Sequence, residues 1–523
     1  MKKICLIVSE QNLATQLKIG AYYKNKGFKV HFIVADRLNC FSIERSEIKK
    51  SFKLFGFENN FTLLDSAEIR LVENWDGKNL KEGVNWDKLY AFEKKYLKDI
   101  GIQRLARCDY AITNDYYDHY IHPFPKDFNL RMKFVEECVQ EVESVINNLK
   151  GYDFISLTDT GLKPLLIHLI STFHKSKSFC LASTRIADKW MLFDSYTIGP
   201  TSEMTQWMNE VSDSDASLAL KKIRSKLDVG EQIYSSHNET IKLSKQSDLK
   251  TLINYYIWVI KHFLVLKVKK RNPNHKVLKL FFPSFKTSIT YITENFLRKK
   301  FYDRNKLLNS ELYVGKKYLY YSLHTMPENH LVLHNDNLDE LELIKNIMLK
   351  LPVSHLLVVK LPPRMRMITG GFSKSNKFFK ELLKLNRVVV VNPNTPSLGI
   401  IKNSQGVICI GGTALLEARI FGKPAYRIGY PEFSCINSIK DVKEIRGLIY
   451  PYESNENLDI GKYIQCCLTH SVSYDPKIAY TIYSSYVSKF KLSKEDAVKH
   501  DLMVDRLCKY LDKRLGYNKK HID

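Results

Sequence analysis

The sequence lacks several features that define whole classes of protein. It has only 22 glycines and 16 prolines among 523 residues, and 44% of its residues are hydrophobic, so collagen-like, mucin-like and broadly disordered chains are excluded. Its ten cysteines are scattered without a CxxC pair, and several lie inside apolar runs, which is typical of reduced thiols in a cytosolic protein. Neither disulfides nor a bound metal is therefore predicted.

Long apolar runs are also scarce. The run that follows the basic start MKK ends at Ser9 and Glu10 after about six residues, too short for a signal-peptide core of roughly 7 to 15, so we interpret it as a first strand. Residues 252–268 are the best membrane candidate, but they carry Lys261 and His262 near their middle, and a spanning helix needs about 20 mostly apolar residues. We expect this segment to be buried or to lie at an acidic membrane surface; a connecting helix with a solvated basic end is the alternative.

The charge is strongly of one sign. Eighty Lys and Arg against 56 Asp and Glu give a formal net charge of +24, which favours anionic partners: nucleic acid, sugar nucleotides or an acidic membrane face. The chain has no zinc-finger spacing, no RGG tract and no basic run with interleaved aromatics. Nucleic acid is therefore not an expected partner.

The first 200 residues predict an open α/β domain. They begin with a strand, a helix that ends at Gly27 and a second strand, which together form a βαβ unit, although no GxGxxG fingerprint of a dinucleotide site is present. Further along this part we expect helices over about 87–112, 130–149 and 163–176, and strands over 153–159 and 178–183.

A second α/β domain is predicted in the last third of the chain. Residues 201–310 are helical and basic in pattern, but from 318 strands and helices alternate over about 110 residues. The polar, helical tail is expected to pack back on the first domain. The predicted domains are an N-terminal Rossmann-like acceptor domain, a helical connecting region, a C-terminal Rossmann-like nucleotide-sugar domain and the C-terminal helices, at 1–200, 201–310, 311–470 and 471–523.

The strongest local signal for chemistry lies at residues 406–424, GVICIGGTALLEARIFGKP. A buried strand leads into Gly411, Gly412 and Thr413, and the helix that follows presents backbone N–H groups, so this turn predicts a phosphate cradle. Glu417, one turn into the helix, can accept ribose hydroxyls or merely favour the helix dipole. A glycine pair after a strand can also be no more than a tight turn.

Two basic segments follow other strands of the same domain. Lys360, Arg364 and Arg366 in VVKLPPRMR can neutralise a phosphate, or form a solvated basic loop. His324 in YYSLHTMPE can donate to a phosphate or carry a proton, or be a structural histidine.

In the first domain, Asp159 ends the strand DFISLTD. A carboxylate at the carboxyl end of a strand faces the expected cleft between the two sheets, so Asp159 is the candidate general base or nucleophile, with a helix N-cap as the competing interpretation. Glu10 is a weaker candidate of the same kind. The DxD formed by Asp213 and Asp215 is interpreted as a helix start and not as a metal site.

Three motifs in this order resemble the capsule polysaccharide synthesis family of bacterial surface-sugar transferases, which includes Kdo transferases. YSLHTMPE at 321–328 is similar to the family segment FPLHxxPE, KLPPRM at 360–365 to KEHPRM, and GGTALLEARIFGKP at 411–424 to TGTxxxEAxxxGKP. More weakly, STRIADKW at 183–190 is similar to SRIGxR. The resemblance extends over residues 318–440 and, more weakly, into the first domain.

The resemblance implies a GT-B fold: two Rossmann-like domains that face a cleft, with a helical insertion, in which the second domain holds the donor nucleotide and the first the acceptor, usually without a catalytic metal. One departure concerns the chemistry. Leu361 and Pro362 stand where the family has an acid and a His, and in sialyltransferase-like relatives that His contacts the donor phosphate. Lys360, Arg364 and His324 remain to neutralise the leaving phosphate.

The expected function is transfer of a sugar from a nucleotide-sugar donor to a glycan or glycolipid in bacterial capsule synthesis, with no cofactor. The protein is expected in the cytoplasm, in peripheral contact with the anionic inner membrane and with other capsule-synthesis proteins. A polyol-phosphate transferase or a sugar-nucleotide epimerase on the same fold is one alternative. A catalytically silent scaffold is another, suggested by the missing histidine.

Overall fold

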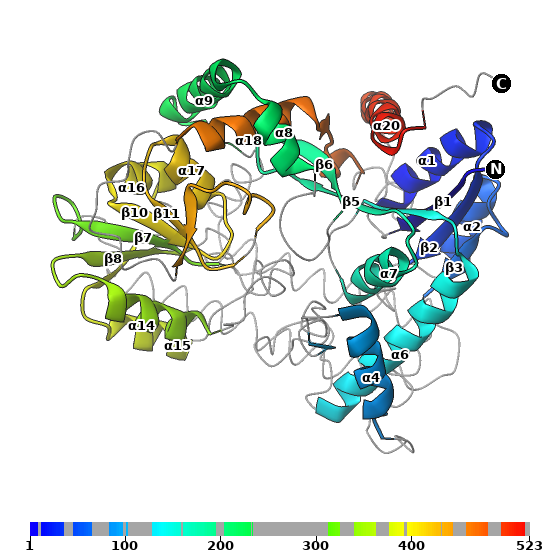
Figure 1. Cartoon of the computed structure of the whole chain (residues 1–523), viewed down its shortest axis with the longest axis horizontal. Coiled ribbons are helices and arrows are strands. Elements are labelled where there is room, and N and C mark those ends of the chain that lie inside the picture. The colour runs from blue at the N-terminus through cyan, green and yellow to red at the C-terminus, as the bar shows by residue number, and fades with distance from the viewer. Residues whose placement is uncertain are drawn as a thin grey trace. The chain divides into compact units, whose positions relative to one another are not determined.

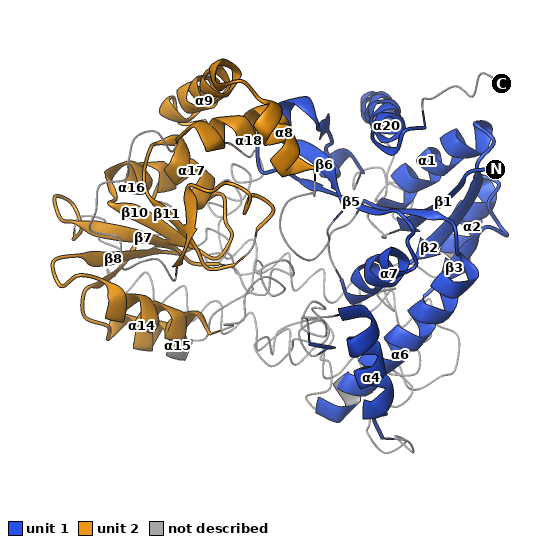
Figure 2. Cartoon of the chain, in the orientation of Figure 1, with its two compact units in different colours: residues 1–112, 125–197, 467–523 blue, residues 113–124, 198–466 orange. Residues whose placement is uncertain are grey.

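The chain folds into two compact units, shown in blue and orange in Figure 2. Unit 1 comprises residues 1–112, 125–197 and 467–523, and unit 2 residues 113–124 and 198–466. The computed structural model describes residues 1–8, 12–35, 45–64, 83–97, 101–102, 128–157, 161–194, 203–231, 233, 312–324, 339–361, 376–391, 395–429, 431–442, 457–479 and 493–517.

The sheet of unit 1 has seven strands in the order β13-β6-β5-β4-β1-β2-β3. The first five in sequence run parallel, β6 is antiparallel to β5, and β13 is antiparallel to β6. Their bounds are β1 Lys3–Val8, β2 Lys29–Val34, β3 Phe61–Leu63, β4 Asp153–Ser156, β5 Ser178–Ser183, β6 Lys189–Phe193 and β13 Val472–Ser473. The order 3-2-1-4-5-6 is that of a Rossmann-like domain, with its switch point between β1 and β4.

The helices of unit 1 include one from the far end of the chain. They are α1 Leu13–Asn25, α2 Arg45–Leu54, α4 Trp86–Phe92 with a π-helical turn over Glu93–Leu97, α6 Phe128–Asn148, α7 Leu162–Phe173 and α20 Lys494–Leu515. Helix α20 lies beside α1, and its buried face shares a core with β1 and β2 (Figure 1). Polar links tie the pair: Thr15 Oγ1 lies 2.9 Å from His500 Nε2, Lys18 pairs with Asp501, and Asp512 accepts from Tyr22 and Lys26.

The sheet of unit 2 is wholly parallel, in the order β12-β11-β10-β7-β8-β9. The strands are β7 Tyr318–Ser322, β8 Leu356–Lys360, β9 Val388–Val391, β10 Gly406–Cys409, β11 Ala425–Arg427 and β12 Ile439–Asp441. The helices are α8 Met204–Glu210, α9 Asp213–Asp228, α14 Glu340–Lys350, α15 Asn376–Leu383, α16 Ser397–Asn403 and α17 Ala414–Ile420, while α18 Leu458–Thr469 crosses the unit boundary. The switch point lies between β7 and β10.

The α/β fold with two Rossmann-like sheets is thus confirmed. The elements expected around the first βαβ unit and from residue 318 onward are present within a few residues of their predicted limits. The short strands β3, β6, β12 and β13 were not predicted. The strand expected at 153–159 ends at Ser156 within the described residues.

The membrane candidate 252–268 lies outside the described residues. Among the helices that the structure does describe, none combines the length and apolar character needed to cross a membrane.

A close helix contact in unit 2 depends on one glycine. A β-carbon placed on Gly461 in α18 would lie 2.4 Å from the backbone oxygen of Ala216 in α9, so the two helix backbones approach closely there. An ion pair between Lys462 and Asp213, 3.0 Å, lies at the same helix pair. The absence of a side chain at Gly461 is therefore a packing requirement.

We expect Gly461→Ala to destabilise the protein by about 2 kcal/mol or more, because backbone atoms of α9 must move to accept the methyl group. Gly399→Ala in α16 is the matched control: its β-carbon meets nothing within 4 Å, so the usual helix preference for alanine should stabilise it by about 0.5 to 1 kcal/mol. Calorimetric unfolding measures both. Equal effects of the two substitutions would contradict the packing argument.

Candidate functional site

The alternation of side chains along the strands of unit 2 brings the polar residues to one face. Leu357 and Val359 on β8, Leu361 just after it, and their counterparts on β7 and β10 pack in the core that contains α14 and α15. The intervening residues point to the opposite face, because successive side chains of a strand alternate. Lys360 therefore projects toward the side of α16 and α17, and Cys409 at the end of β10 does the same.

His324, just past the end of β7, meets Cys409 at the switch point. Its Nε2 lies 3.1 Å from the sulfur of Cys409, and both residues are buried. The backbone N–H of Gly412 also donates to this sulfur, at 3.2 Å. Two of the predicted residues are thus joined by a thiol that the sequence analysis did not single out.

Gly412 fits against this pair without room for a side chain. A β-carbon at position 412 would lie 2.9 Å from Cys409 Sγ and 3.2 Å from His324 Cε1. The backbone N–H of Gly412 is committed to the thiol, so it is not one of the free donors that the predicted phosphate cradle supposes. The lack of a side chain at Gly412 lets its backbone approach Cys409 and His324 closely.

Lys360 and Glu417 form a buried pair of opposite charges. Lys360 is 6% exposed and Glu417 4%, and neither side chain has a hydrogen bond to any residue that the structure describes. Burial lowers the pKa of Lys360 to about 8, although Glu417 opposes the shift. Burial likewise raises the pKa of Glu417 to about 7, with Lys360 opposing. Both groups therefore change charge near neutral pH.

Glu340 at the start of α14 holds the segment that leaves β7. Its Oε1 accepts from the backbone N–H of His324 and from the hydroxyl of Tyr321, both at 3.1 Å. Helix α14 begins with Asp339, whose carboxylate accepts from the N–H groups of Leu341 and Glu342. This capped helix end fixes the place of His324.

Part of the glycine-rich motif serves to end helix α17. Gly422 has a φ of 73°, and the N–H groups of Gly422 and Lys423 donate to the carbonyls of Arg419 and Ala418, a Schellman arrangement that favours glycine. The guanidinium of Arg419 bonds Ser438, Asn457 and the Lys423 carbonyl. These residues are structural, and the predicted site residues of the motif all lie before them, at Gly411, Gly412, Thr413 and Glu417.

The structure also places the start of α17. Gly411 is buried, and Thr413 is the N-cap residue but makes no side-chain capping bond. Because α17 has only seven residues, its dipole is a minor source of positive potential. The charge at this site comes mainly from side chains.

Several predicted residues lie outside the described part of the chain: Glu10, Asp159, Arg364 and Arg366. The N-cap of α7 is Gly161, with a φ of 109°, so the competing interpretation of Asp159 as the N-cap residue is wrong. Asp213 and Asp215 do begin a helix: Ser212 caps α9 by accepting from the Asp215 N–H, and Asp213 pairs with Lys462. Their assignment as a helix start is confirmed.

The fold and its switch point define the class of protein as a two-unit α/β protein of Rossmann-like strand order. No protein-family model and no curated protein sequence matches the chain. Among solved structures, the chain is similar to the β-Kdo 2,4-transferase KpsC of Thermosulfurimonas dismutans, with 10% identity and a TM-score of 0.34 over 60% of this chain and 80% of that one.

The β-Kdo 2,7-transferase KpsC of the same organism matches with 14% identity and a TM-score of 0.28, over 62% of this chain and 79% of that one. A UDP-GlcNAc 2-epimerase from Neisseria meningitidis bound to UDP-GlcNAc matches with 10% identity and a TM-score of 0.19, over 94% of this chain and 100% of that one. At such scores these likenesses carry no argument about activity.

The buried pair predicts a pH dependence of stability. Between pH 4.5 and 7 the unfolded chain releases the Glu417 proton while the folded chain keeps it, so raising the pH favours unfolding. We expect the unfolding free energy of the wild type, relative to Glu417→Gln, to fall by up to about 1.4 kcal/mol per pH unit over this range. Chemical unfolding at several pH values measures the difference.

The control for loss of one negative charge is Glu342→Gln, because Glu342 is an exposed residue of α14 whose side chain is 53% accessible. Stability curves of the wild type and Glu417→Gln that run parallel from pH 4.5 to 7 would show that Glu417 is not held in its protonated form by burial.

Proposed function

We propose that the chain is a glycosyltransferase that moves a sugar from a nucleotide-sugar donor to a glycan or glycolipid acceptor in the synthesis of a bacterial capsule or related surface polysaccharide. One observation carries the proposal: the buried Lys360 has no hydrogen bond to any described residue, and it stands beside the switch point of a parallel sheet, where such folds bind ligands. Burial of an ammonium group without a hydrogen bond is costly even with Glu417 nearby, so a bound anion is the natural counterpart.

The chemistry of the site suits a departing nucleotide. Glycosyl transfer leaves negative charge on the phosphate of the leaving group, and positive groups placed in advance stabilise that charge most in a dry site. Lys360, with a pKa of about 8, is mostly protonated at neutral pH, and the imidazole of His324 lies at the same edge, where it can act as a second donor. Glu417 can accept from a sugar or ribose hydroxyl when it is ionised.

The acceptor would be activated in unit 1. Asp159 follows β4 by three residues, and β4 pairs with β1 at the switch point of that sheet, which is where a general base for an acceptor hydroxyl is expected. Neutralisation of the leaving group is assigned to side chains, so the proposed reaction is metal-independent. Arg364 is proposed to assist Lys360.

Donor binding tests the role of Lys360. We expect Lys360→Met to weaken binding of UDP-, CMP- or GDP-sugars by about tenfold, and to remove the loss of affinity that the wild type should show as Lys360 deprotonates above pH 8. Isothermal titration calorimetry at pH 7 and pH 9 measures both effects. Lys345→Met, which removes an exposed lysine of α14, is the control.

Gly412→Ala provides a steric test of the same site. Its methyl group would displace Cys409 and His324, so donor binding should fall, whereas Gly399→Ala should bind as the wild type does. Wild-type affinity in Lys360→Met and in Gly412→Ala would contradict donor binding at this site.

Turnover tests the role of Asp159. We expect Asp159→Asn to slow release of free nucleotide with a suitable acceptor by about 10² to 10⁴-fold while donor affinity is kept, because only the acceptor hydroxyl loses its base. Asp505→Asn, which neutralises an exposed aspartate of α20 in the same unit, is the matched control and should leave turnover unchanged.

The products distinguish the alternatives. A sugar whose configuration changes while it stays attached to the nucleotide would indicate an epimerase, and transfer of a polyol phosphate would indicate the corresponding transferase. Nucleotide binding without any turnover would indicate the silent scaffold.

A further inference from the structure

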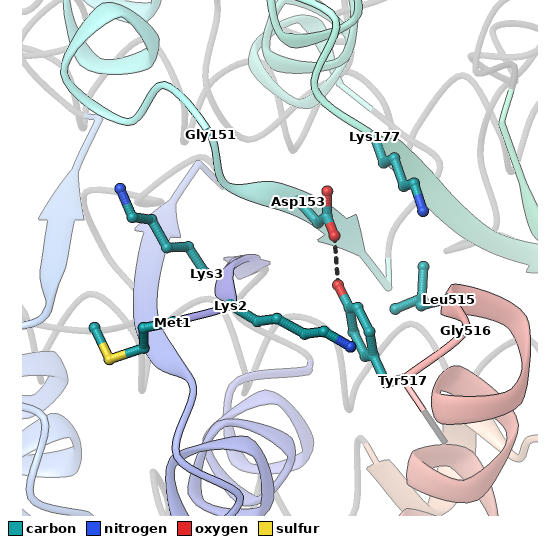
Figure 3. A pocket seen from close by; sticks show the side chains of 9 residues that line it. All are labelled: Met1, Lys2, Lys3, Gly151, Asp153, Lys177, Leu515, Gly516 and Tyr517. Carbon is teal, nitrogen blue, oxygen red and sulfur yellow. Dashed lines mark hydrogen bonds between the residues drawn. The ribbon is translucent and has the colours of Figure 1, made fainter. Parts of the chain in front are cut away.

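A basic pocket lies at the amino-terminal edge of the unit 1 sheet. Its volume is about 370 Å³, within the range of small-molecule sites. Three of its lining residues are lysines, and Asp153 is the single acid among them (Figure 3). The lining comprises Met1, Lys2, Lys3, Gly151, Asp153, Lys177, Leu515, Gly516 and Tyr517.

The wall that carries Tyr517 is fixed by the end of α20. Gly516, with a φ of 69°, reverses the chain after the helix, and the N–H of Tyr517 donates to the carbonyl of Asp512. The ring of Tyr517 then packs on Tyr23 and Phe28, with centroids 5.8 and 4.9 Å apart. One side of the pocket is thus formed by Tyr517, whose ring these contacts hold in place.

The lysines of the pocket keep their charges uncompensated. None of Lys2, Lys3 and Lys177 forms a salt bridge with any residue in the described ranges. Lys2 Nζ lies instead 4.8 Å from the ring centroid of Tyr517, and Lys3 Nζ lies 5.6 Å from that of Tyr152. Aromatic faces steady an ammonium group but leave its N–H donors available to another partner.

The one acid of the pocket is already engaged. Asp153 Oδ2 accepts from the hydroxyl of Tyr517 at 2.5 Å, as the dashed line in Figure 3 shows. The tyrosine thereby holds the carboxylate, and the ammonium groups of Lys2 and Lys177 face the pocket against one negative charge, whereas the side chain of Lys3 points toward Tyr152. An anion that enters gains from this excess.

We propose that this pocket binds a phosphate group, carried either by a small soluble phosphate ester or by the headgroup of an anionic lipid. Lysine is a point charge that suits phosphate, and a volume of about 370 Å³ admits the phosphate together with a glycerol-sized or sugar-sized substituent. The pocket is formed by unit 1 alone, so the proposal stands or falls independently of donor binding in unit 2.

The experiment uses the full chain and two arms. In the first, inorganic phosphate and glycerol 3-phosphate are titrated by calorimetry at low salt; in the second, the protein is sedimented with vesicles of phosphatidylcholine with or without phosphatidylglycerol. We expect the double variant K2Q/K177Q to weaken binding by about tenfold or more, either to the soluble phosphates or to the anionic vesicles, whichever carries the phosphate that the pocket recognises. The control is K221Q/K222Q, which removes two exposed lysines of α9 and so changes the net charge equally.

A gain of affinity separates this site from a general charge effect or a folding defect. Asp153→Asn removes the only acid of the pocket while its amide oxygen can still accept from Tyr517, so binding should tighten several-fold. Binding in either arm with this pattern supports the proposal and names the source. Equal losses in the two double variants, no binding in both arms, or an Asp153→Asn variant that binds no more tightly than the wild type overturns it.

Discussion

The two-residue period of the strands in unit 2 is the constraint on which its candidate site depends. On β7, β8 and β10 one set of alternating side chains enters the apolar core under α14 and α15. The other set must then face α16 and α17, and it is this set that contains Lys360 and Cys409. Because the strands are parallel, their carboxyl ends lie at one edge of the sheet. Polar residues from three segments that are far apart in the sequence therefore come together at this edge. A shift of one residue along β8 would place Lys360 in the apolar core.

Burial of the charged groups at this edge costs desolvation free energy, and the rest of the fold does not require these groups. Lys360 and Glu417 attract each other, yet burial still moves both pKa values toward neutrality, which means that desolvation outweighs the attraction. A pair of apolar side chains of similar size would pack there at lower cost. Retention of ionisable groups in such a place is characteristic of functional sites, where a ligand supplies the missing interactions. The thiol of Cys409 and the carboxylate of Glu340 act differently, since their contacts orient His324.

Much of this arrangement could be predicted from the sequence, because it follows from local patterns. Apolar runs such as VVVV at 388–391 and the helical period of 340–350 locate the elements, and a glycine pair after a strand marks the switch point. Position 422 was matched as part of a motif, but its glycine ends a helix, a role that only the φ of the folded chain reveals. Cys409 was missed because a cysteine inside an apolar run indicates only burial. The signal available was the alternation of side chains, which places Cys409 and Lys360 on the same face of the sheet. The short strands β3 and β13 were missed because two or three residues are too few to show the alternating pattern of a strand.

Parallel strands also separate the chemistry of the two edges of unit 1. Strand β4 begins at Asp153, in the basic pocket, and runs toward Asp159, the proposed base. Its four residues span about 13 Å at roughly 3.3 Å each. That distance exceeds the Debye length of about 8 Å at physiological salt, so charges at one edge are largely screened from the other where water intervenes. An anion held by Lys2 and Lys177, as proposed, would therefore act only weakly through solvent on the base proposed at the opposite edge. The two proposals for unit 1 thus concern different ends of the same strands, so either can hold without the other.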